Sequence, residues 1–254
     1  VDEAVAAGAR AVKTVREVAA AAKVVCICLP SLESAREVIY GAGGLVEGGR
    51  METLVDFSTT GSEFALDIAA RLAERGVTLI DAPITGSVAT AAAGKLGVMC
   101  SGPERGFRQA EPYMHAMASA IVLYLGEQTG RAQRLKLLNN LQSATGMAAS
   151  CEALVLGVKW GLAPEIMIEV MNATDASNNA SRNKIAKSVF PRRFDYGAHM
   201  AITAKDTTLT IGEAEDLGVP MWIGQAVRQL WKYAVSQGGA ERDGTALITY
   251  LEPW

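Results

Sequence analysis

The sequence is poor in histidine and cysteine and has no long apolar run, and these absences exclude several classes of function. Its 254 residues include only two histidines, His115 and His199, and four cysteines. None of them shows the spacing of a zinc, haem or thiol-redox motif. No apolar stretch approaches the about 20 residues that a membrane-spanning helix needs. The formal net charge is −3, so the positive charge that attracts nucleic acid or anionic membranes is also missing. We therefore expect no metal site, and neither nucleic acid nor a membrane as partner.

The cysteines and the N-terminal segment predict a cytoplasmic protein. Cys26 and Cys28 lie two residues apart on one face of an expected strand, and Cys100 and Cys151 stand alone. We expect buried thiols in a reducing compartment rather than disulfides or metal ligands. The first eighteen residues are charged and lack the apolar core of a signal peptide. The first residue is Val1, not Met, which hints at a chain that has been cut or processed.

Short apolar runs alternate with amphipathic stretches in the first half of the chain. The expected strands cover residues 24–30, 53–60, 77–83, 96–102 and 120–126. Helical patterns separate them, such as the amphipathic run over 63–76 that ends at Gly76. Strands that alternate with helices are typical of a parallel sheet covered on both faces. The fold class predicted for this half is therefore α/β, with a doubly wound parallel sheet.

The second half contains only helical signals. A periodic run of about thirty residues begins near residue 130, and three more stretches show apolar residues at three- and four-residue spacing. The boundary is expected near Gly126–Gly130. We predict an α/β domain over 1–127 and an all-helical domain over 128–254.

A polar stripe runs along the first expected helix of the second half. Lys136, Asn140 and Ser143 are spaced i, i+4 and i+7, and Gln133 extends the stripe backwards. Most such stripes face solvent. However, leucine and alanine cover the rest of this helix, and a helix that is apolar nearly all round is usually buried. In that setting Lys136 lines a cavity, where burial lowers the pKa of a lysine toward the range useful in acid–base catalysis. Periodicity does not decide between the two interpretations.

Two polar turns follow expected strands. Thr85, Gly86 and Ser87 come after the strand that ends in Asp81-Ala82-Pro83, and Ser58-Thr59-Thr60 closes the strand before it. Ligands of parallel α/β sheets bind beyond the carboxyl ends of the strands. Hydroxyls and backbone N–H groups in such a turn can bind an anion. Each turn could also be an ordinary connection, and the second could cap the helix that begins near Ser62.

Four motifs resemble the β-hydroxyacid dehydrogenases, a family that includes 3-hydroxyisobutyrate dehydrogenase and the tartronate and succinic semialdehyde reductases. They are "DFSTT", "DAPITGSVATAAAGKLG", "TGRAQRLKLLNN" and "AKD", in the family's order and at compatible spacing. Each motif alone is weak, but four collinear motifs that span most of the chain are specific. The resemblance implies a Rossmann domain, then an all-helical domain, joined by a long helix that bears a catalytic lysine.

The resemblance also implies roles for individual residues. Lys136 matches the catalytic lysine, and Asn140 matches a substrate-binding amide. The turn Thr85-Gly86-Ser87 matches a Ser-Gly-Gly that holds the substrate carboxylate. The matches to cofactor contacts are Leu29, Pro30, Thr59 and Lys205.

The implied reaction interconverts a short β-hydroxyacid and its semialdehyde, with NAD or NADP as hydride carrier. Lys136 would take or give the hydroxyl proton, in a cleft between the two domains. The partner is then a small carboxylic acid. Relatives assemble through the helical half, whose run "MWIGQAVRQLWKYAV" is strongly apolar, so a homodimer or homotetramer is expected.

The sequence departs from the family pattern in several places. Residues 1–30 contain no G-x-G-x-x-G. We expect that roughly forty residues, two strands and a helix, are missing before Val1 if a βαβ unit of ordinary length preceded it. The choice between NAD and NADP depends on that region. Thr85, Ser87, Ala132 and Ala198 replace other residues of the family pattern, which suggests a substrate that differs in size from hydroxyisobutyrate.

The sequence leaves three other identities to compare with this family. A 6-phosphogluconate dehydrogenase shares K-x-x-x-N but usually has His at the position of Asn139 and is much longer. Imine reductases share the architecture but generally lack the lysine. A non-catalytic remnant, which keeps a ligand-binding or dimerisation role, is the alternative from another functional class.

Overall fold

The chain forms two compact units in a computed structural model that describes residues 1–252. The first unit covers Val1–Lys136, and the second begins at Leu137. The helix α7 (Arg131–Lys159) starts in the first unit and continues through the second. This division falls within α7, whereas the domain boundary predicted from sequence lies in the loop before it.

The first unit contains a parallel three-stranded sheet in the order β1-β2-β3. Its strands are β1 (Val24–Ile27), β2 (Thr53–Asp56) and β3 (Thr78–Asp81). Their registers align Ile27 with Asp56 and Asp56 with Asp81. The carboxyl ends of the three strands therefore meet at one edge, where ligands of such sheets bind.

A second, mixed sheet has the order β4-β5-β6. The two-residue β4 (Ile84–Thr85) runs antiparallel to β5 (Gly97–Cys100), which pairs in parallel with β6 (Ile121–Tyr124). A bridge between Asp81 and Ser101 links the two sheets. The expected α/β class with a mainly parallel sheet is confirmed, and the short antiparallel β4 was not predicted.

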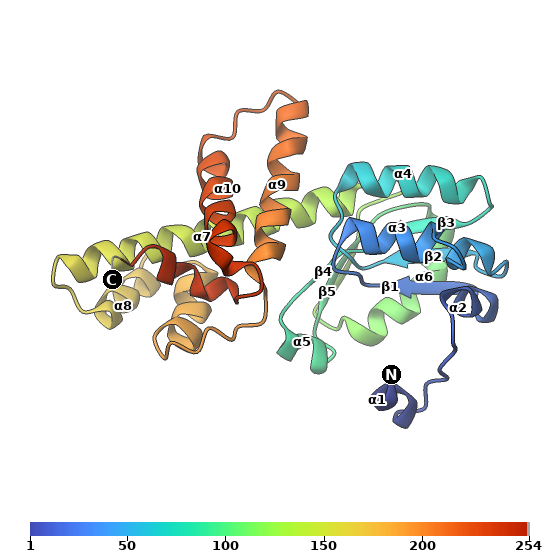
Figure 1. Ribbon diagram of the computed structural model, residues 1–254, viewed down its shortest axis with the longest axis horizontal. Coiled ribbons are helices and arrows are strands. Elements are labelled where there is room, and N and C mark those ends of the chain that lie inside the picture. Colours follow the sequence, from blue (N-terminus) through green and yellow to red (C-terminus); the bar gives the residue numbers. More distant parts are fainter. Residues whose placement is uncertain (253–254) are drawn as a thin grey trace. The chain divides into compact units, whose positions relative to one another are not determined.

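Helices cover both faces of the first sheet. The helices of this unit are α1 (Asp2–Ala6), α2 (Val15–Ala21), α3 (Leu32–Tyr40), the 3₁₀ turn η1 (Leu45–Glu47), α4 (Ser62–Ala73), α5 (Val88–Ala92) and α6 (Glu104–Met117). Side chains fix where several of them begin: Thr14 caps α2, and Ser31 forms a capping box with Ser34 at α3. In Figure 1, α3 and α4 lie on one side of the strands and α6 on the other.

Two apolar clusters hold these layers together. One joins α3 and α4 to the sheet through residues such as Ile39, Ile68 and Leu54. The other joins α6 to the opposite face through Met114 and Ile80. Because successive side chains of a strand point to opposite faces, each strand contributes to both clusters.

The four cysteines divide into two pairs, which corrects part of the expectation. Cys100 and Cys151 are buried, as expected, but Cys26 and Cys28 are exposed. β1 is an edge strand, and α6 packs against β2 and β3 on the face that carries Cys26. An edge strand that the helix does not cover leaves these thiols accessible.

The second unit is helical, as expected. It contains most of α7, α8 (Pro164–Ala173), the π-helical segment η2 (Ala180–Val189), α9 (Met200–Asp216), α10 (Trp222–Ala234) and two short turns, η3 (Val235–Gly239) and η4 (Gly244–Tyr250). One core cluster draws on all of these helices, with Trp231, Met147 and Ile185 among its most buried side chains. Within residues 1–252, no helix combines the length and the apolarity needed to cross a membrane.

Two leucines test the assignment of the core. Leu54 on β2 is 0% exposed, whereas Leu66 on α4 is 45% exposed. Leu54→Ala should lower the free energy of unfolding by about 2–5 kcal/mol, because it leaves a cavity. Leu66→Ala makes the same chemical change at the surface and should cost less than about 1 kcal/mol. Urea unfolding of the two variants measures both values, and equal losses would contradict the placement of β2 in the core.

Candidate active site

A buried carboxylate caps the first turn of α7. Asp81, at the end of β3, accepts hydrogen bonds from the backbone N–H groups of Gly130 (3.2 Å) and Gln133 (3.3 Å). The Ser101 hydroxyl donates to Asp81 (2.8 Å) and accepts from the Ala132 N–H (3.0 Å). The first N–H groups of a helix have no partner within the helix, and its N-terminus favours negative charge. Asp81 and Ser101 therefore anchor the start of α7 to the strand ends.

Burial and hydrogen bonding act on the pKa of Asp81 in opposite directions. Burial raises the pKa above its ordinary value and is the largest contribution, whereas donation from Ser101, Gly130 and Gln133 lowers it. The net direction is upward. Asp81 is 0% exposed, so water does not compensate its charge. The hydrogen bonds at the helix start are what keep this carboxylate satisfied.

Gln133 ties the same turn of α7 to the loop after β2. Its Oε1 atom accepts from the N–H groups of Thr60 (3.0 Å) and Gly61 (3.2 Å), and its Nε2 group donates to the Ser58 carbonyl (3.1 Å). The Ser58 hydroxyl in turn accepts from the Leu29 N–H (2.8 Å), at the end of β1. The loops that follow β1 and β2 are thus held against the start of α7.

Lys136 follows Gln133 by three residues and lies on the turn of α7 after the anchored one. Its exposed fraction is only 9%, and Gln133 is 0% exposed. Of the two interpretations of the polar stripe, the solvent-facing one is therefore wrong for these two residues. Asn140 and Ser143, further along α7, are half-buried. The stripe lies largely out of water.

The turn Thr85-Gly86-Ser87 connects β4 to α5. Thr85 is paired with Gly97 of β5. Gly86 has a φ of +142°, and a side chain there would collide with Thr90 and Leu96, so the turn requires glycine. Ser87 caps α5: its N–H donates to the Thr90 hydroxyl (2.6 Å), and its hydroxyl accepts from the Thr90 N–H (3.3 Å). Ser87 therefore already uses polar groups that a bound carboxylate would need.

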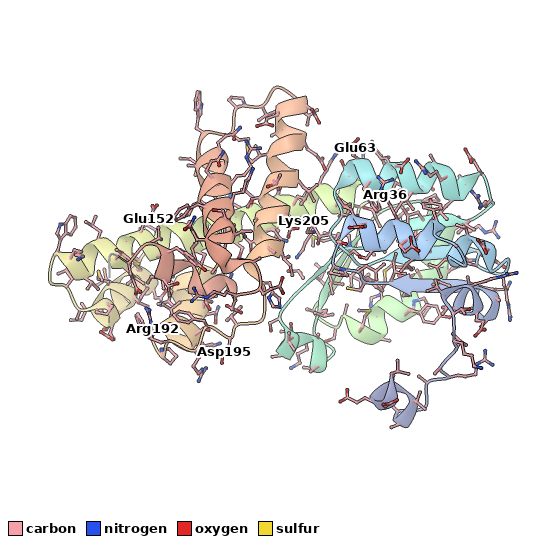
Figure 2. The ribbon with its side chains drawn as sticks, in the orientation of Figure 1. Arg36, Glu63, Glu152, Arg192, Asp195 and Lys205 are labelled. Atoms are coloured by element: carbon pink, nitrogen blue, oxygen red, sulfur yellow. The ribbon has the colours of Figure 1, made fainter. Side chains whose placement is uncertain are left out.

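Asn140 belongs to a second polar cluster, with two residues of α9. Its Nδ2 group donates to Asp206 Oδ2 (2.6 Å), and Lys205 forms an ion pair with Asp206 Oδ1 (2.9 Å). Asp206 is 2% exposed. Figure 2 shows Lys205 on α9. The structure thus brings together two predicted site residues, Asn140 and Lys205, through a carboxylate between them.

Sequence reasoning missed the supporting residues of both clusters. No local sequence pattern indicates that Asp81 and Ser101 cap α7, because their partners on this helix are 31 to 52 positions away in the chain. Asp206 could have been found: it is the second residue of the "KD" pair, where only the lysine received a role. Gln133 was recognised as part of the stripe, but not as the tie to the Ser58–Gly61 loop.

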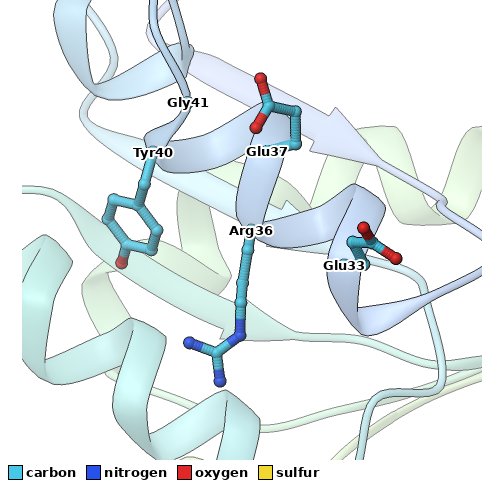
Figure 3. A pocket seen from close by; sticks show the side chains of 5 residues that line it. All are labelled: Glu33, Arg36, Glu37, Tyr40 and Gly41. Atoms are coloured by element: carbon cyan, nitrogen blue, oxygen red, sulfur yellow. The ribbon is translucent and has the colours of Figure 1, made fainter.

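A hollow of about 490 Å³ on the surface of α3 lies apart from these residues. Its lining consists of Glu33, Arg36, Glu37, Tyr40 and Gly41. Figure 3 shows Arg36 and Tyr40 extending to the same side of α3. They connect α3 with α4: Arg36 pairs with Asp67 (3.6 Å), and the Tyr40 hydroxyl donates to the Ile68 carbonyl (3.2 Å). None of the predicted site residues lines this hollow, which we interpret as a helix–helix contact.

The strand ends carry features that fit a dinucleotide. Leu29 and Pro30 follow β1, Thr59 follows the neighbouring β2, and all three side chains reach the surface at least in part. The hydroxyl of the next residue, Thr60, is buried and has no hydrogen-bond partner among the described residues, so this loop keeps unused polar capacity. In residues 1–30, the structure has α1 and α2 and the sequence has no glycine-rich phosphate loop.

Comparisons with known proteins identify the family of this chain. Residues 1–126 match the model of the NAD binding domain of 6-phosphogluconate dehydrogenase, and residues 130–251 match that described as NAD-binding of NADP-dependent 3-hydroxyisobutyrate dehydrogenase. The 2-(hydroxymethyl)glutarate dehydrogenase of Eubacterium barkeri is 31% identical over 98% of this chain and 82% of its own length. The chain belongs to the 3-hydroxyisobutyrate dehydrogenase family.

Two further relatives support the assignment. The NAD-dependent L-serine dehydrogenase of Pseudomonas aeruginosa is 30% identical over 100% of this chain and 87% of its own length. The solved structure of Mycobacterium tuberculosis 3-hydroxyisobutyrate dehydrogenase with L-serine covers 98% of this chain and 86% of that chain, with 27% identity and a TM-score of 0.86. The expected family, fold and enzyme class are confirmed: the protein is an oxidoreductase that uses NAD or NADP. The roles of individual site residues stay predictions.

The Gln133 ties predict a large cost for removing this side chain. Gln133→Ala leaves the buried N–H groups of Thr60 and Gly61 and the Ser58 carbonyl without their partner, so the free energy of unfolding should fall by about 2–4 kcal/mol. Gln128→Ala, an exposed glutamine in the preceding loop, is the matched control and should change it by less than about 0.5 kcal/mol. Chemical unfolding measures both, and similar values would contradict the role assigned to Gln133.

The raised pKa of Asp81 predicts a pH dependence of stability. Because the folded protein holds this proton more tightly than the unfolded chain, the carboxyl contributes most below its ordinary pKa of 3.8, and that contribution is lost as the pH rises through the folded pKa. Asp81→Asn cannot ionise. The free energy of unfolding of the wild type minus that of Asp81→Asn should therefore decrease as the pH rises from 3.8 through the folded pKa. Urea unfolding across this range checks the sign, and an increase would mean that the hydrogen bonds outweigh burial.

Proposed function

We propose that the protein oxidises the primary alcohol of a small 3-hydroxy carboxylic acid to the semialdehyde, and catalyses the reverse reduction, with Lys136 as the proton-transfer residue. The observation that carries the proposal is the burial of Lys136 on a helix turn fixed by Asp81, Ser101 and Gln133. A lysine side chain kept out of bulk water can exchange a proton with a bound alcohol. When bound, NAD or NADP supplies the hydride acceptor.

The proton and the hydride leave the substrate by separate routes. In the oxidation, the Nζ atom of Lys136, in its neutral form, accepts the hydroxyl proton while the C–H hydride departs from the carbinol carbon. The alcohol oxygen becomes the carbonyl oxygen, and Lys136 becomes an ammonium. In the reduction, the ammonium returns the proton to the forming alkoxide. General acid–base catalysis of this kind contributes about 10²–10⁴ in rate.

Asn140 is proposed to orient the substrate one helical turn beyond Lys136. Asp206 accepts one N–H of the Asn140 amide at 2.6 Å and fixes the rotation of that amide. The other amide N–H is then directed by the same constraint and can donate to a substrate oxygen. An amide that a buried carboxylate holds in place loses little entropy when the substrate binds.

The turn at Thr85, Gly86 and Ser87 is proposed to bind the substrate carboxylate. The Thr85 hydroxyl makes no hydrogen bond within the described residues and lies on a strand position fixed by β5. Gly86 lets a ligand approach the backbone. Ser87 contributes only if its capping box with Thr90 opens, so we expect Thr85 to be the stronger contact. Leu29, Pro30, Thr59 and Lys205 are proposed to contact the cofactor.

The names of the relatives narrow the substrate class. 2-(Hydroxymethyl)glutarate, 3-hydroxyisobutyrate and L-serine are the substrates named for them. All three share one reacting unit, a CH₂OH group on a carbon that bears the carboxylate. We propose that the substrate of this protein contains the same unit.

The homodimer or homotetramer and the cytoplasmic location stay predictions. The exposure of Trp222 (83%) and Ile223 (68%) on α10 supports self-association.

Replacing Lys136 tests the proposal directly. Lys136→Ala should lower kcat for 3-hydroxyisobutyrate oxidation by at least about 10²-fold, with the Kd for NAD or NADP changed less than about threefold. Lys159→Ala removes an exposed lysine at the end of the same helix and should leave kcat within about twofold. Steady-state assays and dinucleotide titration on the natural gene product give both quantities. Near-normal turnover by Lys136→Ala would refute the role of this lysine, and a wild type that binds neither NAD nor NADP would favour the non-catalytic remnant.

A further inference from the structure

Lys184 is a lysine from outside α7 that contacts the polar stripe of this helix. It lies in η2 and is half-buried. Its Nζ group donates to the Ser143 hydroxyl at 3.2 Å and lies 5.6 Å from the centre of the Tyr196 ring. Ser143 is the third residue of the stripe, after Lys136 and Asn140. The side chain of Lys184 thus reaches across to the face of α7 on which the proposed catalytic residues lie.

The charge of Lys184 is not balanced by an adjacent carboxylate. Within residues 1–252, none of the ion pairs closer than 4.0 Å involves it. Asp243 and Cys151 act on it only through longer-range electrostatics, and burial lowers its pKa more than these two raise it. Lys205 differs in this respect, since it has Asp206 at 2.9 Å. A partly desolvated ammonium that contacts only a hydroxyl and a ring can still gain much from an anionic ligand.

Neighbouring contacts hold η2 close to α7. The Asn178 amide donates to the Ser150 hydroxyl (3.1 Å). A side chain at Gly146 would come within 3.3 Å of the same amide, so glycine permits this approach. Three small residues of α7, Ser143, Gly146 and Ser150, therefore accept the η2 region through two separate contacts. This packing places Lys184 beside the polar stripe of α7.

The spacing along α7 relates Lys184 to the reacting group. Ser143 follows Lys136 by seven residues, which is about 10 Å of helix rise and two turns on one face. Asn140 lies between them. A substrate whose alcohol is at Lys136 and whose chain extends along the stripe places its far end toward Lys184. A three-carbon backbone with one carboxylate has no group to offer there.

We propose that Lys184 binds a second acidic group of the substrate, so that the protein prefers 3-hydroxy dicarboxylic acids over monocarboxylic ones. The inference rests on the proposed function, because it extends the same substrate site. The first carboxylate, the CH₂OH group and the proton transfer remain as described above. Lys184 contributes affinity and selectivity and takes no part in the transfer of the hydride or the proton.

Two substrates with the same reacting unit test this inference. 3-Hydroxyisobutyrate carries a methyl group where 2-(hydroxymethyl)glutarate carries CH₂CH₂COO⁻. The wild type should have a higher kcat/KM for the dicarboxylate. Lys184→Met should lower the ratio of the two kcat/KM values (dicarboxylate over monocarboxylate) by about 10- to 100-fold, mainly through KM for the dicarboxylate, because a charge-assisted hydrogen bond is lost. Lys184→Arg keeps the charge and should restore at least part of the ratio.

Lys187 provides the matched control on the same segment. It is exposed, and its Nζ donates to Asn183 at 3.3 Å. Lys187→Met removes the same charge from η2 and should leave the substrate ratio within about twofold. Circular dichroism checks that all variants fold. If Lys184→Met does not fold, the Lys184→Arg variant and the wild-type preference still decide the question. The bulkier guanidinium keeps the positive charge but changes its position, so KM for the dicarboxylate should change while KM for the monocarboxylate should not.

The outcomes separate this inference from the proposed function. Turnover of both substrates with a ratio that Lys184→Met leaves unchanged would overturn the inference and leave the proposed function intact. A wild-type preference for the monocarboxylate would do the same. Equal losses on both substrates would assign Lys184 a structural role. Turnover of neither substrate by the wild type, under conditions where NAD or NADP binds, would contradict the proposed function itself.

Discussion

The carboxylate of Asp81 at the start of α7 is the interaction on which the proposed site depends. Asp81 ends β3, where the parallel strands also end, and it accepts two backbone N–H groups of the first helical turn. These hydrogen bonds hold the start of α7 against the ends of the strands. Lys136 lies on the next turn, so the position of its side chain depends on the cap. A buried charge is costly unless its surroundings compensate it, and here the helix N-terminus and Ser101 provide the compensation.

Gln133 extends the same constraint to the loops after β1 and β2. One neutral side chain satisfies two N–H groups and one carbonyl, and the Ser58 hydroxyl carries the connection to Leu29. One hydrogen-bonded network in the first unit therefore joins Leu29, which is proposed to meet the cofactor, to the helical turn that precedes Lys136. Transfer of the hydride from the substrate to the cofactor and of the proton from the substrate to the base each requires reacting atoms about 3–3.5 Å apart. A network without long flexible links is suited to that tolerance.

Periodic patterns predicted most of the fold, and long-range partners explain what they missed. The expected helical stretch over 63–76 corresponds to α4, and the helical second half is confirmed. The strand β4 has two residues, which is too short for an alternating pattern. The exposure of Cys26 depends on where α6 packs, and the sequence near Cys26 contains no information about that. The cap by Asp81 joins residues about fifty positions apart, so no local pattern reports it.

The candidate site was predicted to a different extent for each residue. The spacing of Lys136, Asn140 and Ser143 identified a common face of α7. A stripe that faces solvent and a stripe that is buried have the same spacing, so only the burial of Lys136 distinguished the two interpretations. The "KD" pair named Lys205, and the structure adds that Asp206 holds both Lys205 and Asn140. The lysines near the stripe then differ in one physical respect. Lys205 already has its counter-ion, whereas Lys184 contacts a hydroxyl and an aromatic ring. Because a paired cation gains little from a second anion and an unpaired one gains much, recognition of a distal acidic group falls to Lys184 rather than to Lys205.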